Sequence, residues 1–94
     1  MKQAHSYRDL GEIEWHTMAV EYAQRTGRSY RQAMEYMRER FQPLVEKLID
    51  RGKGELPLSF LNGGVRVPGF RGEHAPSNLV LKKYEGTIHA YLRT

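Results

Sequence analysis

The sequence predicts an α+β fold in which two or three N-terminal helices pack on C-terminal antiparallel β-hairpins. Two observations support this prediction. In the first half of the chain, apolar residues recur every three or four positions, which is the period of a helix with one buried face. In the second half, short β-favouring runs are separated by Asn62-Gly63 and by Glu85-Gly86, which suit tight hairpin turns.

The first predicted helix begins near Leu10 and ends at Gly27. Ser6 with Asp9, and Asp9 with Glu12, have the spacing of capping boxes, in which side chains satisfy backbone N–H groups at the start of a helix. Gly27 is suited to the left-handed conformation that ends many helices. We therefore expect helical structure from about residue 10 to residue 26.

The second predicted helix follows Ser29, which forms a capping box with Gln32, and stops at residues 52–54. It carries the clearest apolar periodicity of the chain, through Tyr30, Met34, Met37, Phe41, Leu44 and Leu48. Pro43 falls inside this pattern and predicts one kinked or broken helix near that residue. The apolar seam also permits homodimerisation, although packing within the chain explains it more simply.

Two hairpins are predicted after the helices. The Asn62-Gly63 turn pairs residues 58–61 with residues 64–67, and the Glu85-Gly86 turn pairs residues 78–84 with residues 87–93. In the second hairpin one face carries Leu79, Leu81, Lys83, Ile88, Ala90 and Leu92. The other face carries Val80, Lys82, Tyr84, Thr87, His89 and Tyr91. We expect the first face to pack under the helices and the second to meet water.

Length and composition indicate one domain, residues 1–94, with a helical part at about 6–52 and a β-hairpin part at about 57–93. The chain has no cysteine, which excludes disulfides and thiolate metal sites. It shows neither a secretion signal nor an apolar run that could span a membrane. We therefore expect a cytoplasmic protein that does not act in the membrane.

The net charge of +4 is unevenly distributed. Residues 52–94 hold six Lys or Arg against three Asp or Glu, whereas residues 1–51 are nearly balanced. A positive balance favours anionic partners such as nucleic acid.

No motif in the sequence fixes a reaction or a cofactor, so it favours a binding protein over an enzyme. His5, His16, His74 and His89 lack the spacing of a metal-ligand set, and no cofactor is expected. The segment from residue 68 to residue 78 has no periodicity, which is typical of a loop where function is often located.

The leading functional prediction is a small basic module that binds nucleic acid, RNA or single strands, through the exposed hairpin face and the 68–78 loop. Exposed aromatic rings stack on unpaired bases while neighbouring cations hold phosphates. The predicted contact residues are Arg66, Arg71, Lys82, Tyr84, His89, Tyr91 and Arg93.

Two alternatives stay open at this point. One is a non-enzymatic inhibitor or adaptor that binds a protein, such as a phage or mobile-element protein that blocks a host enzyme or defence complex. Its contact residues would be Phe70, Arg40, Lys47 and Arg51. The weaker alternative is a metal-free ribonuclease, in which Arg71, His74, Lys82, His89 and Tyr91 supply proton transfer and phosphate stabilisation.

Overall fold

A computed structural model describes residues 6–61, 64–70 and 76–94. The elements in chain order are β1 (Tyr7–Glu12), α1 (Trp15–Thr26), α2 (Tyr30–Tyr36), a π-helical segment (Met37–Phe41), α3 (Gln42–Arg51), β2 (Leu56–Pro57), a 3-10 turn (Leu58–Leu61), β3 (Leu79–Tyr84) and β4 (Thr87–Arg93). The fold is α+β, as the sequence predicts. In this part of the chain, no helix has both the length and the apolar character needed to cross a membrane.

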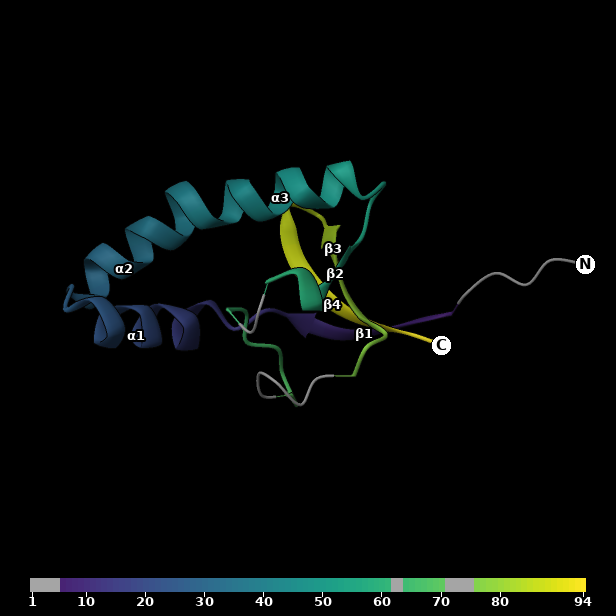
Figure 1. Ribbon diagram of the computed structural model, residues 1–94, viewed down its shortest axis with the longest axis horizontal. Helices are drawn as coiled ribbons and strands as arrows, with labels where there is room; N and C mark the ends of the chain where they lie inside the picture. The colour runs from purple at the N-terminus through teal and green to yellow at the C-terminus, as the bar shows by residue number, and fades with distance from the viewer. Residues whose placement is uncertain (1–5, 62–63, 71–75) are drawn as a thin grey trace, which may run out of the picture.

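The four strands form one antiparallel sheet in the order β1-β4-β3-β2. Figure 1 shows that the chain leaves the sheet along α1 and returns beside it along α2. α2 and α3 form one long helical stretch, and α3 lies against one side of the sheet. The α1–α2 hairpin projects beyond the sheet, so the molecule is elongated, with extents of 53 × 25 × 19 Å. The core joins both parts through Met18, Ala19, Ala33, Met37, Val45, Ile49, Leu79, Leu81, Ile88 and Ala90.

The β3–β4 hairpin has the predicted register, with Leu79 opposite Leu92 and Lys82 opposite His89. Its turn works because Glu85 and Gly86 both adopt positive φ, 49° and 84°. The apolar residues of the predicted inner face belong to the core, whereas Lys83 on the same face is exposed and forms an ion pair with Asp50 of α3. Val80 lies on the opposite face, paired with Tyr91 as predicted. The expectation that this position meets water is wrong, because Val80 is 1% exposed and has Pro57 of β2 on its other side.

The predicted helix start near Leu10 is wrong, because residues 7–12 form strand β1 beside β4. The Asp9 side chain does not cap a helix; it accepts a hydrogen bond from the Gly11 N–H inside a β-bulge, where Gly11 has a φ of 104°. Pairing with β4 gives these backbone groups cross-strand hydrogen bonds that a frayed first helical turn would lack. The helix begins only at Trp15.

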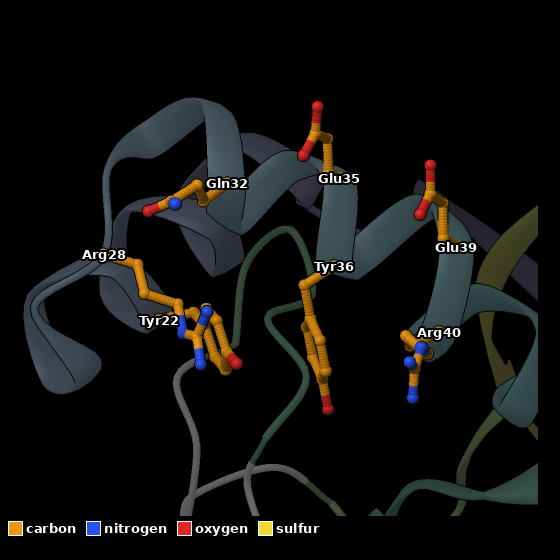
Figure 2. A pocket seen from close by; sticks show the side chains of 7 residues that line it. All are labelled: Tyr22, Arg28, Gln32, Glu35, Tyr36, Glu39 and Arg40. Carbon is orange, nitrogen blue, oxygen red and sulfur yellow. The ribbon is translucent and has the colours of Figure 1, made fainter.

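The predicted ends of the helical hairpin are confirmed. α1 ends at Gly27, which has a φ of 77°, and Ser29 and Gln32 form the reciprocal capping box at the start of α2. Across the hairpin the rings of Tyr22 and Tyr36 stack, with centroids 4.4 Å apart and planes 4° apart (Figure 2).

The long helical stretch differs from the predicted seam because it contains a π-helical segment at Met37–Phe41. The buried positions Ala33, Met37, Val45 and Ile49 are separated by multiples of four residues. In a regular α-helix each step of four drifts by about 40° around the axis. The wider π turn reverses part of that drift, so these side chains stay on the side of the helical stretch that packs on α1 and on the sheet. As a result, Tyr30 and Leu44, two members of the predicted seam, are 45% and 51% exposed.

The predicted first hairpin is also wrong, because residues 58–61 form a 3-10 turn instead of a strand. Residues three apart eclipse in a 3-10 turn, so Leu58 and Leu61 both reach the core while Phe60 is 69% exposed. Val67, predicted to pair with Leu58, instead forms an isolated antiparallel β-bridge with Phe70. The Asn62-Gly63 turn lies outside the described residues.

Candidate functional site

The side of the sheet that faces away from α3 brings together aromatic and polar side chains from three strands. Four of them, Lys82, Tyr84, His89 and Tyr91, are predicted contact residues. Strand β1 adds two residues that sequence reasoning missed, Tyr7 and Asp9. They lie on this side because they pair with Arg93 and Tyr91, whose side chains share it. We call this set the open sheet face: Tyr7, Asp9, Lys82, Tyr84, His89 and Tyr91.

Aromatic rings form a continuous row across the open sheet face. Tyr84 and His89 have ring centroids 5.1 Å apart, His89 and Tyr91 6.3 Å apart, and Tyr91 and Tyr7 6.3 Å apart in an edge-on arrangement. Tyr84 is 49% exposed and Tyr7 37%, while His89 and Tyr91 are half-buried. The two ends of the row therefore have ring surface available to a ligand.

The Lys82 ammonium group lies at the Tyr91–Tyr7 end of the row. Its Nζ is 3.9 Å from the centroid of the Tyr7 ring and 5.4 Å from that of Tyr91. Cation–π attraction of this kind holds the ammonium group over the rings without neutralising it. Lys82 therefore presents a positive charge beside the stacking surfaces.

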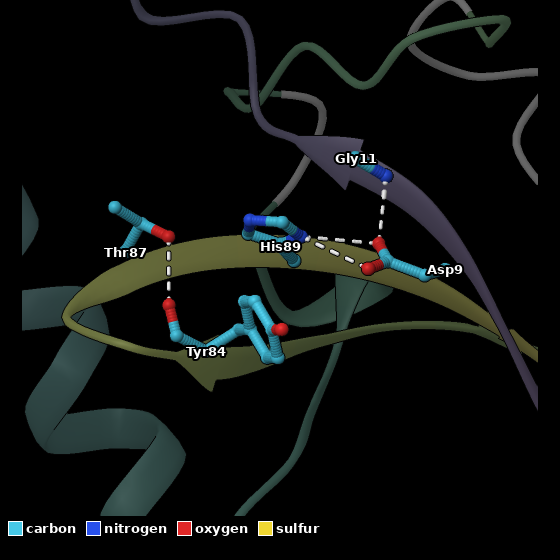
Figure 3. A network of polar contacts seen from close by, with 5 residues as sticks. All are labelled: Asp9, Gly11, Tyr84, Thr87 and His89. Atoms are coloured by element: carbon cyan, nitrogen blue, oxygen red, sulfur yellow. Dashed lines mark hydrogen bonds and ion pairs between the residues drawn. The ribbon is translucent and has the colours of Figure 1, made fainter.

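Asp9 fixes the position of the imidazole in this row. Its Oδ1 accepts a hydrogen bond from the Gly11 N–H at 2.8 Å, and both carboxylate oxygens lie 3.1–3.2 Å from His89 Nδ1 (Figure 3). The Gly11 N–H first, and then His89, lower the pKa of Asp9 below its ordinary value of 3.8. The His89 ring is thus oriented by a carboxylate from the neighbouring strand.

Glu55, just before β2, forms hydrogen bonds with residues of β1 and β4 at the Tyr7 end of the open sheet face. One of its carboxylate oxygens accepts from the Tyr7 hydroxyl and the other from Arg93 Nη1, each at 2.8 Å. The hydrogen bond from the phenol to Glu55 raises the pKa of Tyr7, because it favours the protonated form. Partial burial raises the pKa of Tyr91 as well.

The charge of this surface differs from the basic hairpin face that the sequence suggests. Lys82 and Arg93 stand against Asp9 and Glu55, so the surface is close to neutral when His89 is neutral. The two carboxylates were missed because they come from other parts of the chain. The sequence carries a signal for Asp9 alone: a β-strand at residues 7–12 would bring its side chain to the same side as that of Tyr7.

Two predicted cations are not part of this row. Arg66 forms an ion pair with Glu21 of α1 at 2.9 Å, and its carbonyl accepts from the Glu14 N–H, so it joins residues 64–70 to the helix. Arg71 and His74 lie outside the described residues, as does the whole 71–75 part of the predicted 68–78 loop.

The residues of the protein-binding alternative are spread over the molecule. Phe70 is half-buried and packs against the core. Arg40 lies in the π-helical segment, while Lys47 and Arg51 are exposed on α3. These four side chains are therefore contributed by two separate segments.

The Asp9–His89 pair is the arrangement closest to catalytic machinery. A carboxylate that orients an imidazole can prepare it to accept a proton. General acid–base cleavage of RNA needs a second proton-transfer group, and the predicted one, His74, falls outside the described residues. Within residues 6–61, 64–70 and 76–94, no three His, Asp or Glu side chains gather in a way that could hold a metal ion.

Comparison of the chain with protein-family models, with curated proteins and with solved structures gives no significant match in any of the three.

Proposed function

We propose that this protein binds single-stranded nucleic acid, RNA in the first instance, through the open sheet face. The observation that carries the proposal is the row of four aromatic rings with the Lys82 ammonium group held over it. Bases in a single strand expose their π faces, and stacking on protein aromatics contributes about 1–3 kcal/mol per base.

The position of the row supports this proposal. The helices pack on the opposite side of the sheet, and the ends of the row at Tyr84 and Tyr7 are exposed. An antiparallel sheet with one covered side and aromatic side chains on the other is an arrangement that single-strand RNA binders use. A duplex hides its base faces and has less to gain from such a surface.

The charge balance of the surface determines how strongly binding depends on salt. Lys82 is the cation of the open sheet face that has no carboxylate partner among the described residues. One phosphate contact on a single strand contributes about −0.7 to the slope of log affinity against log salt. Binding at this surface therefore depends mainly on stacking and only weakly on salt.

A pair of tyrosine variants tests the proposal. Tyr84→Ala removes the most exposed ring of the row and lies outside the core, so we expect a folded protein whose affinity for a labelled oligouridine falls roughly tenfold, from the loss of one stacked base. The matched control is Tyr30→Ala, because Tyr30 is 45% exposed and lies on α2, away from the sheet. Equal losses in the two variants, with unchanged circular dichroism, would contradict the proposal.

A protein partner is the second candidate, and the neutrality of the surface favours it. Glu55 pairs with Arg93, and Asp9 with His89, which leaves a surface dominated by tyrosine rings, a side chain enriched in protein interfaces. Association with a protein at this surface would persist in high salt and would be lost in Tyr84→Ala without any measurable affinity for oligonucleotides.

A further inference from the structure

A second surface, on the helical hairpin, combines stacked tyrosines with unpaired arginines. A cleft of about 430 Å³ lies along α2 and the π-helical segment and includes one residue of α1. Its volume is in the range of ligand pockets, about 300–1,000 Å³. It is lined by Tyr22, Arg28, Gln32, Glu35, Tyr36, Glu39 and Arg40.

The side chains of this cleft are sorted by charge. Figure 2 shows Arg28 and Arg40 extending to the same side as the two tyrosine rings, one at each end of the stacked pair. Glu35 points to the opposite side of the helix, as does the neighbouring Glu39. Both glutamates still contribute to the lining of the cleft, so its positive charge is concentrated on the tyrosine side, at the two guanidinium groups.

The polar groups on this side are hydrogen-bond donors that have no partner in the described part of the chain. Neither Arg28 nor Arg40 forms an ion pair there, whereas Arg66 and Arg93 are both paired with glutamates. The hydroxyls of Tyr22 and Tyr36 also form no hydrogen bond with a described residue, and both point to the arginine side. A ligand on this side must accept hydrogen bonds, and the two guanidinium groups favour a ligand that carries negative charge there.

The rings determine what else the ligand contains. Tyr36 is 37% exposed, and its ring face turned away from Tyr22 looks toward Arg40. A flat group can stack on that ring face while guanidinium groups hold an adjacent phosphate in bidentate fashion. A phosphate linked to a planar base is the repeating unit of a nucleic-acid strand.

We propose that this cleft is a second contact for single-stranded nucleic acid, in which Arg28 and Arg40 each hold a backbone phosphate beside the Tyr22–Tyr36 stack. The assignment rests on the function proposed above and adds the phosphate-binding component that the nearly neutral sheet face lacks. The protein then combines base stacking on its sheet with phosphate binding on its helical hairpin.

The salt dependence of binding tests this assignment. For Arg28→Gln with Arg40→Gln, we expect the slope of log affinity against log salt for a labelled oligouridine to become shallower by about 1.4, the value for two phosphate contacts on a single strand. The matched control is Arg38→Gln with Arg51→Gln, which removes the same charge from exposed arginines outside the cleft. The slope of log affinity against log salt should change clearly less in this control than in the double variant of Arg28 and Arg40.

The outcomes separate the two proposals. Equal changes of slope in the two double variants would overturn the cleft assignment, because only overall charge would then matter. If Tyr84→Ala weakens binding but the Arg28 and Arg40 substitutions do not, the sheet surface stands and the cleft does not. If the unmodified protein binds no oligonucleotide, both proposals fail. Arg28→Lys with Arg40→Lys, which keeps the charge and removes bidentate geometry, guards against a folding defect and should give an intermediate affinity.

Discussion

Asp9 shows at the scale of one residue how the open sheet face is stabilised. Its carboxylate receives the Gly11 N–H from its own strand and faces His89 Nδ1 on β4. Both neighbours favour the charged form of the carboxylate, so its pKa in the folded protein lies below the unfolded value. The stabilisation is complete above that unfolded value, 3.8, and is lost as the pH falls through the lower folded pKa.

We therefore expect Asp9→Asn to lower the free energy of unfolding at pH 7, by at most about 1 kcal/mol because the Asp9 side chain is 45% exposed. The difference should shrink as the pH falls below 4, because the carboxyl of the folded wild-type protein takes up its proton as the pH falls through its lowered pKa. Urea unfolding at several pH values measures it, with Glu39→Gln as a control for loss of a negative charge. If the difference in free energy of unfolding between the two proteins stayed constant from pH 7 to pH 2, the charge of Asp9 would not be the source of the stabilisation.

At the scale of the element, the β3–β4 hairpin was predictable and strand β1 was not. The hairpin is specified locally, because a two-residue turn fixes which side chains of residues 79–84 and 87–93 face each other. The pairing of β1 depends on β4, and the contact of Asp9 with His89 joins residues 80 positions apart. Local spacing in residues 6–12 fits a helix start equally well, so only the free edge of β4 decides the outcome.

The turn of this hairpin offers a stability test. Glu85 has a φ of 49°, a left-handed conformation that costs an ordinary residue about 1–2 kcal/mol and that Asn tolerates better. Glu85→Asn creates the Asn-Gly pair preferred in this turn, and we expect it to raise the free energy of unfolding by about 1 kcal/mol. Thermal unfolding measures the gain, and Glu85→Gln, which lacks the preference of Asn, should show none. A loss of stability in Glu85→Asn would contradict the turn geometry.

The helices show the same limit of local information. The ends at Gly27 and Ser29 follow from capping chemistry and are confirmed. The buried seam depends on the π-helical segment at Met37–Phe41. Pro43 predicts a disturbed helix near this place, but it does not specify a π turn or its position. Packing on the sheet selects it, because it brings Val45 and Ile49 to the core in place of Leu44.

At the scale of the whole molecule, the candidate surfaces arise from distant segments that the fold brings together. Four of the six residues of the open sheet face follow from the predicted hairpin register, whereas Tyr7, Asp9 and the neighbouring Glu55 depend on non-local pairing. Likewise, the cleft needs α1 and α2 side by side before Arg28 and Arg40 flank one pair of rings. Composition predicts the anionic preference of the molecule but not where its unpaired cations lie.

The most direct test of nucleic-acid binding is a fluorescence-anisotropy titration of the unmodified protein with labelled single-stranded RNA, single-stranded DNA and duplex DNA at several salt concentrations. We expect single strands to bind more tightly than the duplex. Phosphate contacts at Lys82, Arg28 and Arg40 predict a slope of log affinity against log salt of about −2, because each contact on a single strand contributes about −0.7. No binding at low salt, or a duplex bound as tightly as the single strands, would contradict the account and direct attention to a protein partner.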